Sequence, residues 1–336
     1  MWIPERAETS GISDDGPLAR TKSPRPHVGG HRKTYIHGFA NEDAMASGKL
    51  KLGLVQMRME RSSLDNLSKA VAMTGTAASQ GADIVCLPEL FMSRYFAQHD
   101  VSDAVDLTEL AVRIPGSETA TLAQCAKENG ITLVAGSLYE LDRGKLFNTS
   151  CVFGPNGRMI GRYRKTHVPQ DESYYEQSYF APGDMGFKVF PTPKAKIGVN
   201  ICYDQWFPEA ARCEALLGAD VLFYPTAIGH VKNISEAEGD WPTAWENVMR
   251  GHAIANSFIV VAVNRVGKEE DMRFWGGSCV IDAFGRTIAR CGAKELVVVV
   301  EADLEHSEMV RKGWRFFPNR RPECYGRIVE EVPKEG

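Results

Sequence analysis

The sequence lacks the features of several large classes of protein. No apolar run approaches the roughly 20 residues that a membrane-spanning helix needs, and the stretch VVVVEADL (297–304) is short enough for a buried strand. With 39 Lys and Arg against 43 Asp and Glu, the formal net charge is −4, and no block of one sign dominates. We therefore expect neither a membrane nor a nucleic acid to be a partner of this protein.

Motifs for disulfides, metals and nucleotides are also missing. The eight cysteines are scattered and none forms a C-x-x-C pair, which is not typical of a disulfide framework in a chain of 336 residues. We expect reduced thiols and a cytoplasmic location. H-E-x-x-H, zinc-ligand spacings, a Walker loop and G-x-G-x-x-G do not occur, so the sequence predicts no metal and no organic cofactor.

The chain divides by composition near its start. Residues 1–44 are rich in Gly, Pro, Ser and charge and show no helical or alternating period, which predicts a disordered N-terminal extension. Met45 is a plausible natural start of translation. No linker composition follows it, so we expect a single domain over residues 45–330.

From Lys49 onward, strand and helix patterns alternate. Two hairpins are expected, at 146–165 around GPNG and at 277–291 around DAFG. The strand expected at 131–141 follows a helix over 116–130 that Ser117 should cap. Hairpins among βα units predict an α/β fold with mixed sheets covered by helices on the outside.

Three polar residues stand where expected strands end. Glu89 follows a buried strand and a proline in CLPELF, and a carboxylate held against an apolar wall there is a usable base. Lys165 ends a hairpin strand in YRKTHVP, and Cys202 in ICYDQWFPE lies between a strand and a helix starting at Pro208. Amide N–H groups at a helix start can stabilise a thiolate. Together these residues could supply a base, a cation and a nucleophile.

Each of these residues also has an ordinary interpretation. A glutamate after a proline is usually a surface residue, a strand-end lysine is usually solvated, and an apolar-flanked cysteine is usually part of a core. His167 and His230 are rival bases for a cysteine–histidine site. The joint occurrence of three competent side chains at strand ends favours the catalytic interpretation.

CLPELF, YRKTHVP and NICYDQWFPEAAR resemble the three signature regions of the nitrilase (carbon–nitrogen hydrolase) superfamily, and the resemblance extends from about Lys49 to Ile328. It implies a four-layer α-β-β-α sandwich, two mixed sheets flanked by helices. It also implies a catalytic triad in which Glu89 is the base, Lys165 stabilises the oxyanion and Cys202 is the nucleophile. The supporting second glutamate of the superfamily falls on Glu176, and the backbone N–H of Tyr203 would be a further oxyanion donor.

Within the superfamily, the sequence is most similar to the members that hydrolyse N-carbamoylputrescine to putrescine, carbon dioxide and ammonia. Such a substrate ends in a primary ammonium, so its pocket should present acids or aromatic faces. The candidates are Asp171, Glu172, Tyr175 and Trp206. The sequence departs from the pattern at Gln170, where an aspartate is usual, and at Tyr203, where a tryptophan is usual.

Other amidohydrolases of the superfamily remain alternatives: an N-carbamoyl amino-acid amidohydrolase, a β-ureidopropionase or an ω-amidase. These bind substrate carboxylates and should place arginine in the pocket, for which Arg94, Arg320 and Arg321 are the candidates. A non-catalytic binding protein with this fold is a further alternative. The resemblance also implies self-association as a dimer or a larger homo-oligomer.

Overall fold

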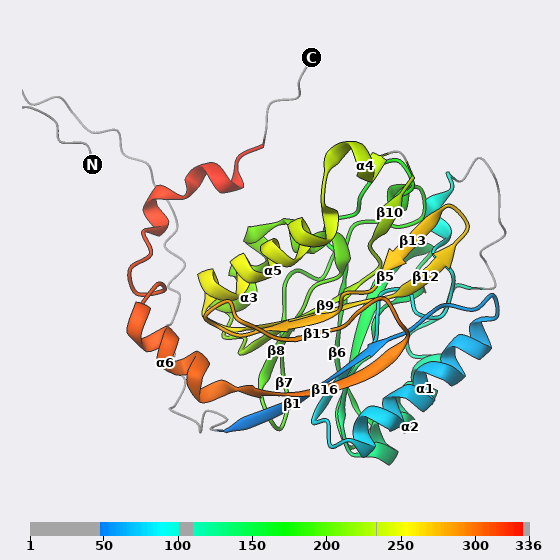
Figure 1. Cartoon of the computed structure of the whole chain (residues 1–336), viewed down its shortest axis with the longest axis horizontal. Coiled ribbons are helices and arrows are strands. Elements are labelled where there is room, and N and C mark those ends of the chain that lie inside the picture. The colour runs from blue at the N-terminus through cyan, green and yellow to red at the C-terminus, as the bar shows by residue number, and fades with distance from the viewer. Residues whose placement is uncertain (1–47, 101–109, 233, 332–336) are drawn as a thin grey trace, which may run out of the picture. The chain divides into compact units, whose positions relative to one another are not determined.

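The computed structural model of the chain describes residues 48–100, 110–232 and 234–331 (Figure 1). A seven-stranded mixed sheet contains the N-terminal strands, in the order β16-β1-β2-β3-β5-β4, with β6 also paired to β5. Its strands are β1 (Lys49–Gln56), β2 (Ile84–Cys86), β3 (Thr132–Val134), β4 (Leu138–Asp142), β5 (Lys145–Phe153), β6 (Met159–Arg164) and β16 (Leu296–Asp303).

A second mixed sheet of six strands has the order β15-β14-β11-β9-β8-β7. Its strands are β7 (Val189–Pro191), β8 (Lys196–Val199), β9 (Val221–Thr226), β11 (Ile259–Asn264), β14 (Cys279–Ile281) and β15 (Thr287–Arg290). A small antiparallel sheet, in the order β10-β13-β12, is formed by β10 (Gly229–Val231), β13 (Met272–Trp275) and β12 (Val266–Glu269).

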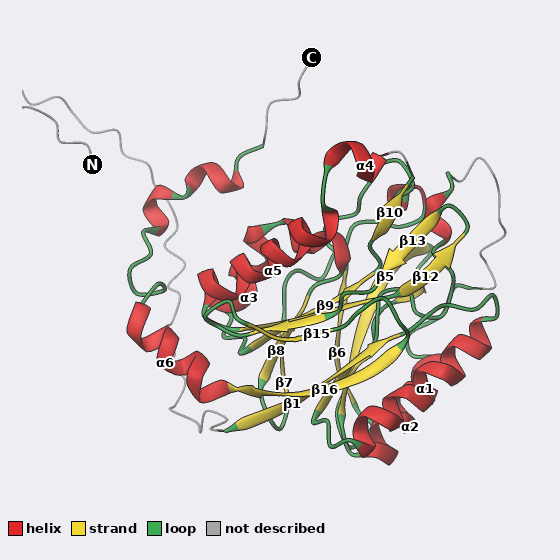
Figure 2. Cartoon of the chain, viewed as in Figure 1, coloured by secondary structure: helices red, strands yellow, loops and turns green. Residues whose placement is uncertain are grey.

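Helices cover the outer faces of the two large sheets (Figures 1 and 2). One apolar core joins α1 (Ser63–Ser79) and α2 (Ser117–Asn129) to the first sheet, and another joins α3 (Pro208–Leu216) and α5 (Trp241–Asn256) to the second. A third core, which includes Leu54, Val199 and Val261, lies between the sheets. The expected α-β-β-α sandwich is therefore confirmed. The remaining helices are α4 (Ile234–Glu238), α6 (Leu304–Trp314) and the 3₁₀ turns η1 (Phe96–Gln98), η3 (Glu176–Ser178), η4 (Cys202–Trp206), η5 (Pro322–Cys324) and η6 (Gly326–Val329).

Both hairpins form around their expected turns, but two local predictions were wrong. Helix α2 is capped by Gly116 and not by Ser117, because the Thr119 hydroxyl accepts a hydrogen bond from the Gly116 N–H at 2.8 Å. The strand expected at 131–141 breaks at Gly136 into β3 and β4, since this glycine has a φ of +50°. A Cβ at Gly136 would lie 2.1 Å from the Pro88 carbonyl oxygen, so the break makes room for the loop that carries Glu89.

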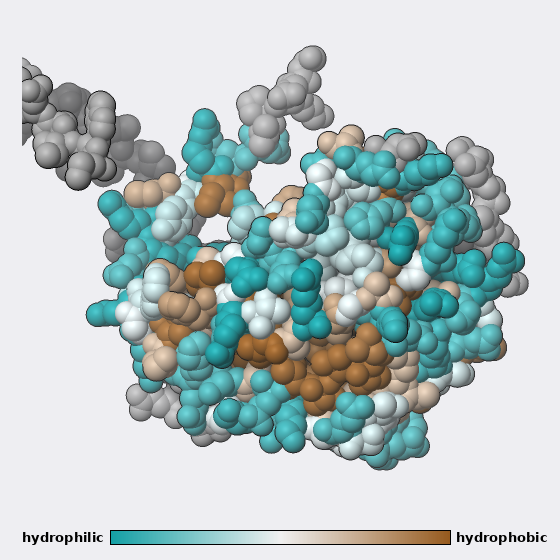
Figure 3. All heavy atoms as spheres, viewed as in Figure 1, coloured by the Kyte–Doolittle hydropathy of each residue, from teal (hydrophilic) through white to brown (hydrophobic). Residues whose placement is uncertain are grey.

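The expected extension over residues 1–44 lies outside the described residues. None of the described helices combines the length and the apolar character required to cross a membrane. The all-atom view shows apolar side chains gathered at the position of β16 (Figure 3), whose valines from 297 to 300 are half-buried. The expected strand at 297–304 is thus an edge strand that begins and ends one residue earlier than predicted and is only partly buried.

Candidate active site

A buried lysine joins two buried carboxylates. The ammonium of Lys165, directly after β6, lies 2.9 Å from Glu89 Oε1 and 2.6 Å from Glu176 Oε2, and all three side chains are fully buried. Burial acts to lower the pKa of Lys165, but the Glu176 and Glu89 carboxylates outweigh it and raise the pKa above its ordinary value. The ammonium is therefore charged, and its field holds the two acids together.

Glu176 begins the η3 turn and has a second partner. Its Oε1 accepts a hydrogen bond from the Tyr95 hydroxyl at 2.7 Å. Burial, with the nearby Glu89, raises the pKa of Glu176, while Lys165 and Tyr95 act to lower it. Glu176 and Glu89 together thus fix the position of the Lys165 ammonium.

Glu89 lies in the loop after β2, where both its side chain and its backbone are held. Oε1 accepts hydrogen bonds from Lys165 and, at 2.8 Å, from the Asn148 amide. The guanidinium of Arg265 donates to the Glu89 carbonyl at 2.6 Å and is itself paired with Glu269. Oε2 of Glu89 is buried and has no hydrogen-bond partner among the described residues. One oxygen of this carboxylate is therefore anchored and the other is free to take a proton.

Cys202 lies at the turn between β8 and α3, as the sequence predicted. The cysteine starts the 3₁₀ turn η4, whereas α3 begins six residues later at Pro208. Its φ is +41°, an uncommon backbone conformation for a residue with a side chain, and the residue is only 5% exposed. Burial and the Glu89 carboxylate raise the pKa of the thiol well above its ordinary value, and Lys165 lowers it only in part. This environment favours the thiol over the thiolate, so a base has to take the proton before the sulfur can act as a nucleophile.

Asp204 connects the cysteine turn to the strand that carries Lys165. Its Oδ2 accepts hydrogen bonds from the Ile201 N–H at 2.9 Å and the Tyr163 hydroxyl at 2.8 Å. Its Oδ1 accepts from both the backbone N–H and Nδ1 of His167, at 2.9 and 2.8 Å. One buried carboxylate thus sets the position of Cys202 relative to Lys165.

We predict that Asp204→Asn lowers the free energy of unfolding by about 2–3 kcal/mol, because the new amide nitrogen cannot accept the two hydrogen bonds from His167. Urea unfolding measures this change. Asp184→Asn is the matched control, since Asp184 is 59% exposed and forms a surface ion pair with Arg164. Equal, small effects of the two substitutions would contradict the role given to Asp204.

A cavity of about 600 Å³ opens onto the cysteine. Aromatic and acidic side chains dominate its wall, and the described residues that line it include no Lys, Arg or His. The lining residues are Pro169, Asp171, Glu172, Tyr174, Glu176, Cys202, Tyr203, Gln205, Trp206, Ile228, Ile234, Glu238, Trp241 and Ala244. The cavity therefore has the electrostatic character of a site for a cationic group.

The structure brings most of the predicted site residues to this cavity. Asp171, Glu172 and Trp206 line it, as do Cys202, Tyr203 and Glu176, while Lys165 and Glu89 lie directly behind Glu176 through their contacts with the ammonium. Tyr175, predicted to bind substrate, is not among the described residues that line the cavity. Its neighbour Tyr174 lines the cavity instead, because residues 171–174 form a tight turn in which Ser173 has a φ of +64°.

The two histidines considered as alternative bases and the three arginines considered as carboxylate-binding residues lie outside the Cys202 cavity. His167 is bound to Asp204 and stacks on Phe207 at 3.7 Å, and His230 packs against Trp275. Neither histidine, and none of the three candidate arginines, is among the described residues that line the cavity. Arg320 lines a separate groove, and Arg321 pairs with Glu323 on the surface. Sequence analysis missed Asn148, Arg265, Glu238 and Trp241, which have no local signature.

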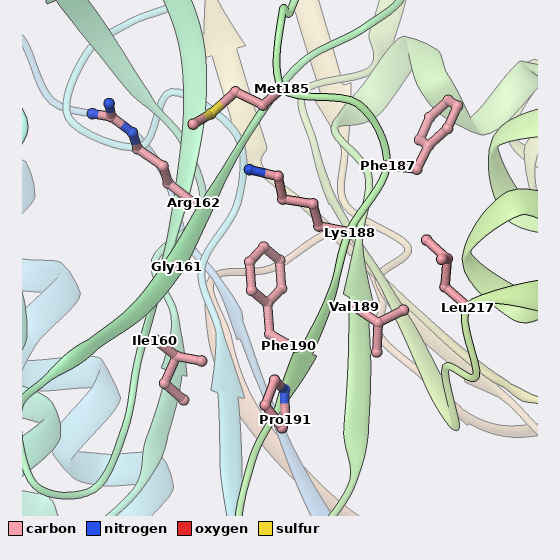
Figure 4. A pocket seen from close by; sticks show the side chains of 10 residues that line it. All are labelled: Ile160, Gly161, Arg162, Met185, Phe187, Lys188, Val189, Phe190, Pro191 and Leu217. Carbon is pink, nitrogen blue, oxygen red and sulfur yellow. The ribbon is translucent and has the colours of Figure 1, made fainter. Parts of the chain in front are cut away.

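A second cavity of about 620 Å³ lies between β6 and the segment that leads into β7 (Figure 4). Ile160, Phe187, Phe190 and Lys188 are among its lining residues. No predicted catalytic or substrate-binding residue is among the described residues that line it. The second cavity therefore lies apart from the predicted site residues.

Comparison with known proteins identifies the class. Residues 51–312 match the family model described as carbon–nitrogen hydrolase. The chain is 40% identical over 273 residues to the N-carbamoylputrescine amidase of Solanum lycopersicum, covering 77% of this chain and 88% of that protein. The chain thus belongs to the carbon–nitrogen hydrolase family, the nitrilase superfamily, and it is an amidohydrolase.

Relatives with other named activities are nearly as similar. The citrullinase of Francisella tularensis is 36% identical, covering 84% of this chain and 99% of that protein, and an omega-amidase of Xenopus laevis is 37% identical, covering 84% and 98%. Among solved structures, a carbon–nitrogen hydrolase from Helicobacter pylori G27 is 35% identical with a TM-score of 0.80, covering 85% of this chain and all of that one. These likenesses support the class and the fold but do not select one substrate.

Proposed function

We propose that this amidohydrolase cleaves a carbamoyl amide whose distal end is cationic, and that its substrate is N-carbamoylputrescine. The observation that supports this substrate is the wall of the Cys202 cavity, where Asp171, Glu172 and Glu238 contribute acids and no described lining residue is basic. Trp206 and Trp241 supply aromatic faces for an ammonium. The similarity to plant N-carbamoylputrescine amidases agrees with this choice.

In the proposed first half-reaction, Cys202 attacks the carbamoyl carbon while its thiol proton moves to the free oxygen of Glu89. The ammonium of Lys165 donates two of its three N–H groups to the Glu89 and Glu176 carboxylates. The third N–H is available to donate to the substrate's carbonyl oxygen as negative charge develops on that oxygen. The N–H of Tyr203, the residue after the nucleophile, is the second donor; loss of one such donor typically costs roughly 3 kcal/mol of transition-state stabilisation. Glu89 then returns its proton to the departing amine, which leaves as putrescine.

The second half-reaction releases the enzyme. Glu89 takes a proton from water, the hydroxyl adds to the carbonyl carbon of the S-carbamoyl cysteine, and the thiolate leaves and recovers the proton. The product carbamic acid decomposes to carbon dioxide and ammonia. Glu176 keeps Lys165 aligned throughout, since its hydrogen bonds to the ammonium and to Tyr95 do not change.

Citrulline and the substrates of ω-amidases carry a carboxylate, which requires a cation or several donors for its recognition. Arg94, Arg320 and Arg321 do not line the cavity within the described part of the chain. An anionic substrate group would instead face Asp171, Glu172 and Glu238. The acidic wall therefore disfavours β-ureidopropionase, N-carbamoyl amino-acid amidohydrolase and ω-amidase activity.

A substrate panel tests the proposal. We expect kcat/KM for N-carbamoylputrescine to exceed that for citrulline and for carbamoyl-β-alanine by at least about a hundredfold, equivalent to roughly 2.7 kcal/mol of discrimination. Glu238→Gln and Glu172→Gln should raise KM for the diamine derivative several-fold and leave kcat nearly unchanged, because they remove ground-state binding.

Glu236→Gln is the matched control, since Glu236 lies on the same short helix as Glu238 but is not among the described residues that line the cavity. Preferred turnover of carbamoyl-β-alanine or citrulline would reject the diamine substrate while leaving the hydrolase class intact. Failure of every amide in the panel would favour the alternative of a non-catalytic binding protein.

We also propose that the protein self-associates in the cytoplasm. A groove of about 700 Å³ runs between α3, α5 and the C-terminal segment, and Trp206 lines both this groove and the cavity of Cys202. Leu216 and Ile328, which also line it, are 47% and 59% exposed. All eight cysteines are free thiols, which agrees with a reducing compartment.

Light scattering should show a dimer or a larger assembly for the wild type, and Leu216→Lys should shift it toward the monomer, because the charge would be buried at the contact. Lys194→Glu, on a different surface, should have no effect. A wild-type monomer at every concentration tested would contradict self-association.

A further inference from the structure

Several buried polar atoms between α3 and the second sheet have no partner. Glu214 projects from α3, Asn200 follows β8 and Tyr224 lies in β9, and all three residues are fully buried. The two oxygens of Glu214, the amide oxygen and nitrogen of Asn200 and the hydroxyl of Tyr224 have no partner in hydrogen-bond geometry within the described part of the chain. The Asn200 side chain does approach the Tyr224 hydroxyl and acts to lower the pKa of Tyr224, which burial raises. Buried polar groups are rarely left unpaired in native proteins, so this cluster requires an explanation.

The strand register places these groups on one face. Gly198 is paired with Leu222, and side chains two residues apart in a strand point to the same side, so Asn200 and Tyr224 share the face of Gly198 that meets α3. A Cβ on Gly198 would lie 1.7 Å from Glu214 Oε2. The Glu214 carboxyl therefore occupies the space above Gly198. In the sequence, Gly198 precedes Asn200 by two residues and Cys202 by four.

No cation neutralises Glu214 among the described residues. The backbone of Lys188 approaches the carboxyl without reaching hydrogen-bond geometry, and Figure 4 shows the Lys188 side chain pointing away from Leu217, the residue that follows α3. Burial, followed by the Asp204 carboxylate, raises the pKa of Glu214 well above its ordinary value. The titratable groups that face this cluster are Asp204 of η4, Tyr163 of β6, Tyr224 of β9, His252 of α5 and, on α3 itself, Cys213.

We propose that Glu214 binds a bridging water together with Asn200 and Tyr224 between α3 and the second sheet, and that Glu214 is thereby a positioning residue for the nucleophile. An uncharged carboxyl, a carboxamide and a phenol each donate and accept, which suits a bridging water. Asn200 is two residues before Cys202, whose strained φ of +41° must be held by its surroundings.

The first test compares wild type with Glu214→Gln in urea at pH values from 5 to 8. A carboxyl whose pKa is higher in the folded than in the unfolded state contributes stability below the unfolded pKa, and this contribution is lost as the pH rises toward the folded pKa. The ratio of the wild-type to the Glu214→Gln unfolding constant should therefore rise with pH, by up to about tenfold per unit. For Glu209→Gln, on the exposed first turn of α3, the corresponding ratio should stay flat. A flat ratio for Glu214→Gln would overturn the proposal.

The second test concerns the nucleophile and rests on the proposed role of Cys202. Glu214→Gln should keep the wild-type kcat, whereas Glu214→Met and Tyr224→Phe should lower kcat about tenfold with KM changed less than twofold, because they displace the reactive sulfur. If Glu214→Met does not fold, Tyr224→Phe, which removes one oxygen, carries the comparison. Unchanged kcat in Tyr224→Phe would reject the positioning role.

The rate of iodoacetamide alkylation at Cys202, read by mass spectrometry, gives the same comparison without a substrate. We expect alkylation about tenfold slower in Tyr224→Phe than in Glu214→Gln. The unfolding and alkylation measurements need no assumption about which amide is hydrolysed. If the enzyme does not hydrolyse N-carbamoylputrescine, these two measurements therefore still test the role of Glu214.

Discussion

Cys202→Ala should lower kcat by a factor on the order of 10⁴ or more, because it removes the atom that forms the covalent intermediate. In the proposed mechanism Cys202, Glu89 and Lys165 act as a unit, so Glu89→Gln in the same background should add little further loss. Stability should change little, since the sulfur makes one weak polar contact, 3.8 Å from the Ala227 carbonyl. Turnover of N-carbamoylputrescine or of any accepted amide, with the wild type measured in parallel, checks the expectation.

Cys213→Ala is the matched control because this thiol is exposed on α3 and should be silent in turnover. Mass spectrometry of the wild type during turnover should show an adduct on Cys202 alone. An adduct on another cysteine, or a Cys202→Ala variant within tenfold of wild type, would reject the proposed nucleophile.

Lys165→Met should have the largest effect on stability, together with loss of activity. Without the ammonium, Glu89 and Glu176 are left buried beside each other with no cation, and removing one partner of a buried pair costs about 3–5 kcal/mol. The loss should be greatest at neutral pH and smaller toward pH 5, because the two unpaired carboxyls then take up protons in the folded state. Urea unfolding across this pH range measures both effects.

Lys194→Met is the control for this substitution. Lys194 lies 3.6 Å from Asp83 and its side chain is 57% exposed, so the change should stay within about 0.5 kcal/mol at every pH. If Lys165→Met were as stable as this control, the lysine would not be the centre of the buried charge cluster.

Local sequence was sufficient to place Glu89, Lys165 and Cys202 at strand ends. Glu89 and Cys202 each follow a short apolar run, and Lys165 ends a hairpin strand shortly before a proline. The mixture of hairpins and βα units predicted mixed sheets covered by helices. The four-layer sandwich itself was implied by the resemblance to the nitrilase superfamily. Tyr174 could not be distinguished from Tyr175, since the turn at 171–174 depends on Ser173 adopting a left-handed conformation that serine rarely adopts. The complete burial of Lys165 was also not foreseen, because one of its two carboxylate partners, Glu89, lies 76 residues earlier in the chain.

Long-range partners were not predictable for the same reason. Arg265 donates to the carbonyls of Glu89 and Leu90, which lie more than 170 residues earlier in the chain. Glu238 and Trp241 reach the cavity from a segment more than 60 residues after Asp171. The spacing of these residues in the sequence does not predict that they meet. They are brought together only when the two sheets pack against each other.

The acids of the cavity wall and the buried cluster of Lys165 and Glu89 are held by different kinds of structural element. Asp171 and Glu172 lie on a surface turn, and Glu238 ends a short helix, whereas Lys165 follows a sheet strand and Glu89 is clamped by Arg265. With this arrangement, substitutions in the cavity wall can change which substrate binds without disturbing Lys165 and Glu89. It offers a physical reason why relatives of similar sequence carry names as different as N-carbamoylputrescine amidase, citrullinase and omega-amidase. It also marks residues 170–174 and 234–241 as the segments to randomise when redirecting the enzyme.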